Sequence, residues 1–108
     1  MPTTTIPLAV TADAAARVAE LGMDREFEAM LEHSRQFVPG LRSIAVSLEH
    51  DLDQGGDPGV VIWAHREEPG PGDDPTDRRW AAWKVETFSP HICIHFVLLS
   101  LFGAADGR

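Results

Sequence analysis

The 108-residue chain has little cysteine and little positive charge, and each shortage excludes a class of protein. Cys93 is the single cysteine, so no disulfide can form within the chain and a disulfide-stapled secreted scaffold is excluded. Nine Lys and Arg residues stand against seventeen Asp and Glu, which gives a formal net charge of −8. Nucleic-acid binding needs clustered cations, and only Arg78 and Arg79 are adjacent, so we expect no nucleic-acid partner.

The chain also lacks a hydrophobic run that would suit a membrane. Its longest apolar stretch, from Ile92 to Phe102, is interrupted by His95 and Ser100 and is shorter than the roughly 20 residues of a transmembrane helix. The N-terminal sequence MPTTTIPLAV has no basic region and no long apolar segment, so it is not a signal peptide. These features predict a cytoplasmic protein with no membrane partner.

Motifs that would assemble an enzyme site are missing as well. The sequence contains no Gly-x-Ser-x-Gly elbow, and its glycine-rich stretch GGDPG has neither the lysine nor the following helix of a P-loop. Residues 51–57, DLDQGGD, resemble the start of a calcium loop, but Ile62 stands where the final glutamate ligand belongs. We interpret 51–57 as a solvated hairpin loop, expect no cofactor, and predict that the protein is not an enzyme.

The first part of the chain shows helical spacing. Thr11 is a good N-cap for a helix that ends at Gly22, and a second helix is expected from Asp24 to a stop at Pro39–Gly40. Apolar residues recur at helical spacing in the second helix and predict its buried face, with Ser34 in the same stripe: Phe27, Met30, Leu31 and Val38.

After residue 40 the apolar residues recur every second position. Residues 41–50 and 59–65 both alternate in this way, which predicts an antiparallel hairpin with a long connection. Residues 6–10 alternate similarly, and Pro7 favours an edge position for this strand. The acidic stretch 67–77, rich in Pro and Gly, is predicted as a loop that leads into a helix ending near residue 88.

The segment 89–102, SPHICIHFVLLSLF, is expected to form a largely buried helix. Ser89 is a good N-cap, Pro90 suits the first helical position, and Gly103 stands where a C-terminal cap belongs. Three β-branched residues prefer strands and leave a strand as the alternative: Ile92, Ile94 and Val97. Apolar residues on nearly every side predict burial in either case.

Together these segments predict an α+β fold in a single domain, residues 1–108. A small antiparallel β-sheet, made of the hairpin and the N-terminal edge strand, is packed on one face by three to four helices. Helices covering the face of Ile62 leave Val61, Trp63 and His65 on the opposite face. We expect this second face to mediate self-association or contact with a protein partner.

The chain has three tryptophans and no tyrosine. Trp80 and Trp83 are three residues apart on a predicted helix and adjoin, so core packing is their expected role. For Trp63 both core packing and a place at a protein–protein contact, where tryptophan is enriched, stay open.

His91, Cys93 and His95 are spaced two apart and raise the question of a metal site. In a strand, neighbouring side chains on one face lie about 6.6 Å apart, too far for three of them to share one zinc with bonds of about 2.0–2.3 Å. In a helix, His91 and His95 share a face while Cys93 points away. His91 and His95 therefore form the candidate metal site of an alternative function, a metal- or small-molecule-binding protein that recruits further ligands from elsewhere.

The order of the segments resembles a loose group of small bacterial α+β proteins. The resemblance covers residues 25–102 and lies in the helix EFEAMLEHSRQFVPGL, the strands RSIAVSLEHDLD and GVVIWAH, a W-x-x-W helix and SPHICIHF. Members of this group have no established activity, and some are encoded in two-gene units of the toxin–antitoxin kind. The resemblance implies a binding partner and carries over no catalytic residue.

Negative charge, a spare apolar sheet face and the absence of an assembled catalytic motif favour one function. We predict a non-enzymatic protein-interaction or regulatory module that forms a homodimer or binds a protein partner. In its most specific form this is the acidic partner of a two-component, toxin–antitoxin-like system.

Overall fold

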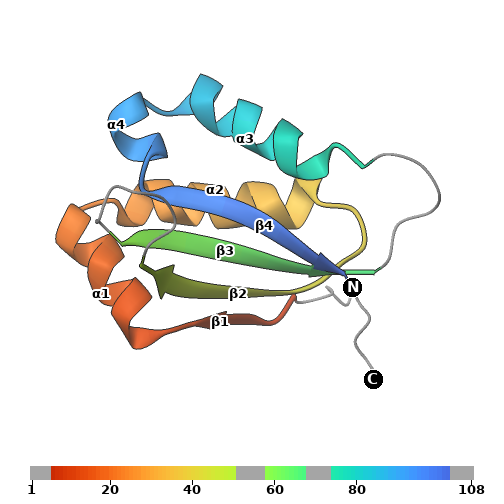
Figure 1. The fold of residues 1–108 in the computed structure, drawn as a ribbon, viewed down its shortest axis with the longest axis horizontal. Coiled ribbons are helices and arrows are strands. Elements are labelled where there is room, and N and C mark those ends of the chain that lie inside the picture. The colour runs from red at the N-terminus through yellow and green to blue at the C-terminus, as the bar shows by residue number, and fades with distance from the viewer. Residues whose placement is uncertain (1–5, 51–57, 68–73, 103–108) are drawn as a thin grey trace, which may run out of the picture.

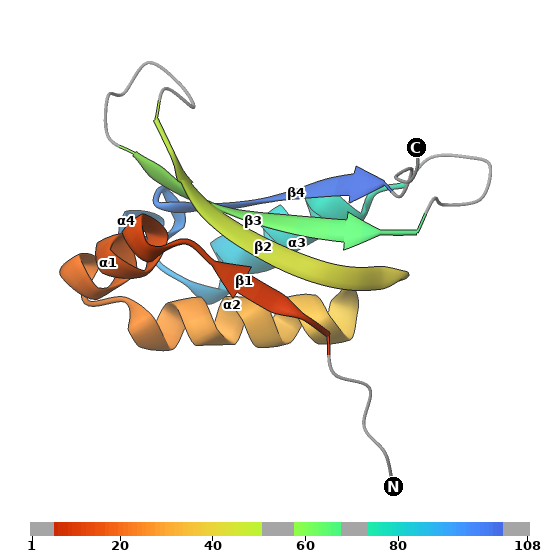
Figure 2. The same ribbon diagram turned by 90° about the horizontal axis from the view of Figure 1, so that it is seen from below.

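The computed structural model describes residues 6–50, 58–67 and 74–102, which form an open sheet with helices on one side (Figures 1 and 2). Along the chain these residues form β1 (Leu8–Val10), α1 (Ala12–Leu21), α2 (Asp24–Phe37), β2 (Leu41–Glu49), β3 (Gly59–Arg66), α3 (Thr76–Thr87), α4 (Pro90–Cys93) and β4 (Phe96–Phe102). The predicted α+β architecture, a small sheet covered on one face by helices, is confirmed. The loop at 51–57 lies outside the described residues.

Local signals fix the first two helices where the sequence predicts them. The Thr11 hydroxyl accepts a hydrogen bond from the Ala14 N–H at 3.3 Å and caps the start of α1. Gly22 ends α1 in the left-handed conformation with φ of 70°, which glycine adopts without strain. None of the helices in the described ranges is long and apolar enough to cross a membrane.

The sheet is mixed, with the strand order β1-β2-β3-β4. The central β2–β3 hairpin is antiparallel, as predicted. Both outer strands, however, run parallel to their neighbours, β1 to β2 and β4 to β3. The prediction of a purely antiparallel sheet is therefore corrected at both edges, because each outer strand is joined to its neighbour through helices, and such a crossover returns the chain in the same direction.

The two helical connections have opposite hands. Both connections lie on the same face of the sheet, where α2 and α3 share one core (Figure 2). Each connection leads to the next strand in the same direction across the sheet, from β1 to β2 and from β3 to β4. The pair β1 and β2, however, runs antiparallel to the pair β3 and β4. One connection must then be left-handed, and it is β1–α1–α2–β2 (Figures 1 and 2). Connections between parallel strands are nearly always right-handed, so β1–α1–α2–β2 is an exception to that preference.

The segment expected to be one buried helix is instead a short helix followed by a strand. Pro90 occupies the first turn of α4, as predicted, but the helix ends at Cys93 and the chain continues as β4. Strand-favouring residues and the ladder offered by β3 outweigh the helix start signal. Burial is also less complete than expected, since Ile94 is 76% exposed and Leu101 40%.

The core between sheet and helices centres on a buried hydrogen bond. Trp80 of α3 is 1% exposed, and its indole N–H donates to the Ser34 hydroxyl of α2 at 3.0 Å. Ser34 in turn donates to the Met30 carbonyl at 2.8 Å. The serine predicted in the apolar stripe of α2 is thus buried and paired, and Trp80 takes the core position expected for it.

Replacing Ser34 with alanine should lower the free energy of unfolding by about 1–3 kcal/mol, because the buried indole N–H of Trp80 loses its acceptor. In the Trp80→Phe background the same substitution should cost clearly less, since no N–H is then left unpaired. Urea denaturation of the four proteins in this double-mutant cycle measures the coupling. Equal costs in both backgrounds would contradict the role assigned to the hydrogen bond.

Candidate functional site

The face of the sheet that the helices leave uncovered is the first candidate site. Val60, Ile62 and Ala64 of β3 belong to the core under the helices, so alternate residues of the sheet point to the other side. We define the outer sheet face by the residues that share this side on β2, β3 and β4: Ser43, Ala45, Ser47, Glu49, Val61, Trp63, His65, Val97, Leu99 and Leu101. The structure thus places Val61, Trp63 and His65 together on one face.

These residues are not equally accessible. Val61 is fully buried, so it offers no surface, whereas Trp63 and His65 are half-buried. Leu99 and Leu101 of β4 are 36% and 40% exposed. The accessible apolar surface therefore lies over β3 and β4, and sequence reasoning missed the part on β4 because that segment was expected to be a helix.

A hydrogen bond from the indole N–H fixes the orientation of Trp63 on the outer sheet face. Its indole N–H donates to the Ser47 hydroxyl at 2.9 Å, and Ser47 donates to the Glu49 carboxylate at 2.7 Å. Ser47 pairs with Val61 across the strands, so the bond runs diagonally over the sheet. The remaining surface of the indole is hydrocarbon in a fixed orientation, which suits a hot spot for protein binding.

His91 and His95 lie near one another, with ring centroids 6.4 Å apart and nearly perpendicular planes. Cys93 is turned toward α3, where its Sγ donates to the Lys84 carbonyl at 3.3 Å. The three residues are not brought together as ligands, in agreement with the argument from their spacing. Within the described ranges, no group of three or more His, Cys, Asp or Glu side chains could hold a metal ion. Metal binding by the His91–His95 pair thus stays a prediction.

Lys84 joins α3 to the start of β4. Its ammonium group donates to the Cys93 carbonyl at 3.1 Å and to the Phe96 carbonyl at 2.6 Å. Burial lowers the pKa of this amine from its usual 10.5, an effect that the nearby Cys93 opposes. The two carbonyl contacts fix the backbone on either side of the junction between α4 and β4.

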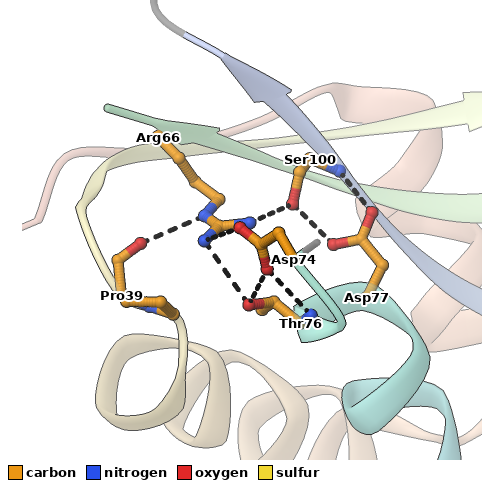
Figure 3. A network of polar contacts seen from close by, with 6 residues as sticks. All are labelled: Pro39, Arg66, Asp74, Thr76, Asp77 and Ser100. Atoms are coloured by element: carbon orange, nitrogen blue, oxygen red, sulfur yellow. Dashed lines mark hydrogen bonds and ion pairs between the residues drawn. The ribbon is translucent and has the colours of Figure 1, made fainter. Parts of the chain in front are cut away.

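A buried arginine organises the opposite end of α3 (Figure 3). Arg66, 3% exposed at the end of β3, donates to the Pro39 carbonyl at 3.0 Å, the Ser100 hydroxyl at 3.1 Å and the Asp74 carboxylate at 2.9 Å. Asp74 accepts from the Thr76 N–H and hydroxyl, and these bonds, followed by the contact with Arg66, lower its pKa.

Sequence reasoning missed this network, although one signal was available. Arg66 continues the alternation of Val60, Ile62 and Ala64, so it points inward, where an arginine needs partners. Asp77 completes the network by accepting from the N–H and hydroxyl of Ser100. The groups bond to one another, so the network holds α3 against β4.

A third cluster surrounds His33 of α2. Its ring stacks on Trp83 of α3 with centroids 3.7 Å apart and an interplanar angle of 4°, and Phe37 lies 5.0 Å away on α2. The His33 Nε2 atom is buried and has no hydrogen-bond partner in the described part of the chain. Burial lowers the pKa of this imidazole from its usual 6.5. Trp83 therefore packs between helices, as expected for it.

Replacing Arg66 with methionine should lower the free energy of unfolding by about 2–4 kcal/mol, because the buried hydrogen bonds of the guanidinium group are lost together. Arg42→Met is the matched control, since Arg42 is an exposed arginine on β2 and its loss should change stability by less than about 0.5 kcal/mol. Urea denaturation compares the two variants. Similar stability of both would contradict the structural role of the network.

His33 should make stability depend on pH below neutrality. Its pKa is lower in the folded chain than the 6.5 of an unfolded one, so in that window the unfolded chain binds more protons. The free energy of unfolding should thus rise with pH up to about 6.5 and fall as the pH drops below it. His33→Gln should flatten this dependence, whereas His91→Gln, at an exposed histidine, should not. Urea denaturation from pH 5 to pH 8 gives the free energy of unfolding of both variants as a function of pH. Parallel curves for wild type and His33→Gln would refute the role of His33 in this pH dependence.

Comparisons of the chain with models of protein families, with curated proteins and with solved structures found no match. The resemblance to small bacterial α+β proteins therefore stays a prediction. Two features of the described residues remain as a basis for function: the outer sheet face, with exposed apolar residues, and three polar or aromatic clusters that hold the helices in place.

Proposed function

We propose that this chain is a non-enzymatic protein-interaction module that binds a basic partner protein through the outer sheet face. The observation that carries the proposal is a surface on β3 and β4 that the helices leave uncovered, made of His65 and four apolar residues: Trp63, Val97, Leu99 and Leu101. Leu99 and Leu101 are more than one-third exposed, and apolar surface of this kind marks interaction sites on soluble proteins.

Charge favours a basic partner over a second copy of the chain. The net charge is −8, so two copies repel each other, whereas a basic protein is attracted. Glu49, at the end of β2, is the one charged residue among those that define the outer sheet face. An apolar centre with charge at its rim is the arrangement of protein–protein interfaces, in which charge steers the partner to its place.

The same features support the specific form of an acidic partner in a two-component, toxin–antitoxin-like system. Such a partner works by covering the surface of another protein and needs no catalytic group of its own. The polar residues around the buried Arg66 bond to one another: Asp74, Thr76, Asp77 and Ser100 (Figure 3). They stabilise the scaffold and leave the outer sheet face as the functional surface.

Replacing Trp63 with aspartate should weaken binding of the protein encoded by the adjacent gene by about 30-fold or more, the effect of losing a hot spot of about 2 kcal/mol. Val85→Asp is the matched control, because Val85 is 65% exposed on α3, away from this face, and gains the same charge. Calorimetry at two salt concentrations gives the affinity and the electrostatic contribution to the binding free energy.

Three results would contradict the proposal. The first is no binding of the adjacent gene's product by the folded wild-type chain. The second is equal affinity for the Trp63→Asp and Val85→Asp variants. The third is a wild-type homodimer in light scattering that Trp63→Asp dissociates, since the occupant of the face would then be a second copy and not a basic protein.

A further inference from the structure

β4 is the last strand of the sheet, and the register of its pairing with β3 determines which of its backbone groups point to the outer edge. The Val60 N–H donates to the His95 carbonyl at 2.9 Å, and Val60 pairs with Phe96 in a parallel ladder. In such a ladder the N–H and C=O of alternate residues point to opposite sides of the strand. The odd-numbered residues of β4 therefore bond to β3, and four residues direct their backbone groups to the free edge: Phe96, Leu98, Ser100 and Phe102.

Two side chains of α3 already occupy groups at this edge. The Asp77 carboxylate accepts from the Ser100 N–H at 3.1 Å, and the Lys84 ammonium donates to the Phe96 carbonyl at 2.6 Å. Asp77 and Lys84 are seven residues apart and so share one face of the helix. In Figure 1 α3 runs alongside β4 on the side away from β3.

The sequence of β4 gives this edge no protection of its own. Edge strands usually carry a lysine, a proline or a bulge that prevents pairing with another chain. β4 reads FVLLSLF, a neutral segment of high strand propensity and of the kind that pairs with copies of itself. The other edge strand, β1, has only three residues and is protected by its length. The Asp77 and Lys84 side chains supply the protection that β4 lacks.

We propose that the β4 edge is a pairing surface for a second copy of this chain, and that Asp77 and Lys84 keep it closed. An antiparallel pair on a two-fold axis at Leu99 places Leu98 opposite Ser100 of the second copy and Phe96 opposite Phe102 of the second copy. That ladder needs the Ser100 N–H and the Phe96 carbonyl. Asp77 and Lys84 hold these two groups, so the ladder cannot be completed while these two side chains are in place.

A second copy fits this edge better than another protein does. The chain carries a net charge of −8 and repels copies of itself along most approaches. β4 has no charged residue over its whole length, so two β4 strands meet without like charges in contact. A two-fold axis also pairs β4 with an identical strand, so the two strands match in length and register.

The test is the double variant Asp77→Ala with Lys84→Met, which removes both guards and leaves the net charge at −8. Light scattering over a concentration series should show its mass rise from one to two chains, while the wild type shows no such dimer. If the double variant fails to fold, each single variant frees one of the two groups and should dimerise at higher concentration. Folded variants that never dimerise would overturn the proposal.

Three further variants separate edge pairing from other causes of association. Val18→Ala, in the core under α1, lowers stability but leaves α3 and both guards in place, so it should not dimerise. Leu99→Lys, added to the double variant, should restore the monomer, because it sets two lysines opposite each other on the two-fold axis. Trp63→Asp, added instead, should leave the dimer intact, since Trp63 lies on the outer sheet face. A dimer that Trp63→Asp dissociates, or that Leu99→Lys leaves unchanged, would refute pairing through β4.

Discussion

The position of α3 depends on one buried contact, and much of the molecule depends on the position of α3. The indole of Trp80 meets the hydroxyl of Ser34 where α3 faces α2, and both side chains are fully buried. An indole N–H without a partner there would cost more than the bond itself contributes, so this contact tolerates little displacement. With α3 fixed, Trp83 stacks on His33, Lys84 reaches the start of β4, and Asp77 reaches Ser100.

All the described helices pack on one face of the sheet, so one face is covered and the other is left without a helical layer. Under the helices the sheet is sealed by large apolar side chains and by the Arg66 network at one end. On the other face, small residues of β2 adjoin Trp63 of β3, and Trp63 in turn neighbours Leu99 of β4. The topology therefore leaves apolar side chains of β3 and β4 uncovered by helices, and the proposed binding surface needs no cavity.

Elements with a strong local signal could be predicted from the sequence. Thr11 and Gly22 bound α1 through capping, and alternation identified both strands of the hairpin and the face of Trp63. For the segment 89–102 the sequence predicts a helix, with a strand as the alternative, because Ser89 and Pro90 signal a helix start. The structure has α4 followed by β4, since the ladder beside β3 is a long-range contact that local signals do not show. The roles of Asp77 and Lys84 were not predictable for the same reason, since each depends on a strand whose place only the tertiary structure reveals.

The left-handed connection between β1 and β2 has a consequence for how the chain folds. The β2–β3 hairpin joins segments that are near in sequence, so it closes with little loss of chain entropy and can form early. β1 can pair only after two helices have crossed the sheet against the usual twist preference, and it brings just three residues to the ladder. Its docking is then a late and readily reversible step, which would leave the outer side of β2 transiently unpaired in newly synthesised chains.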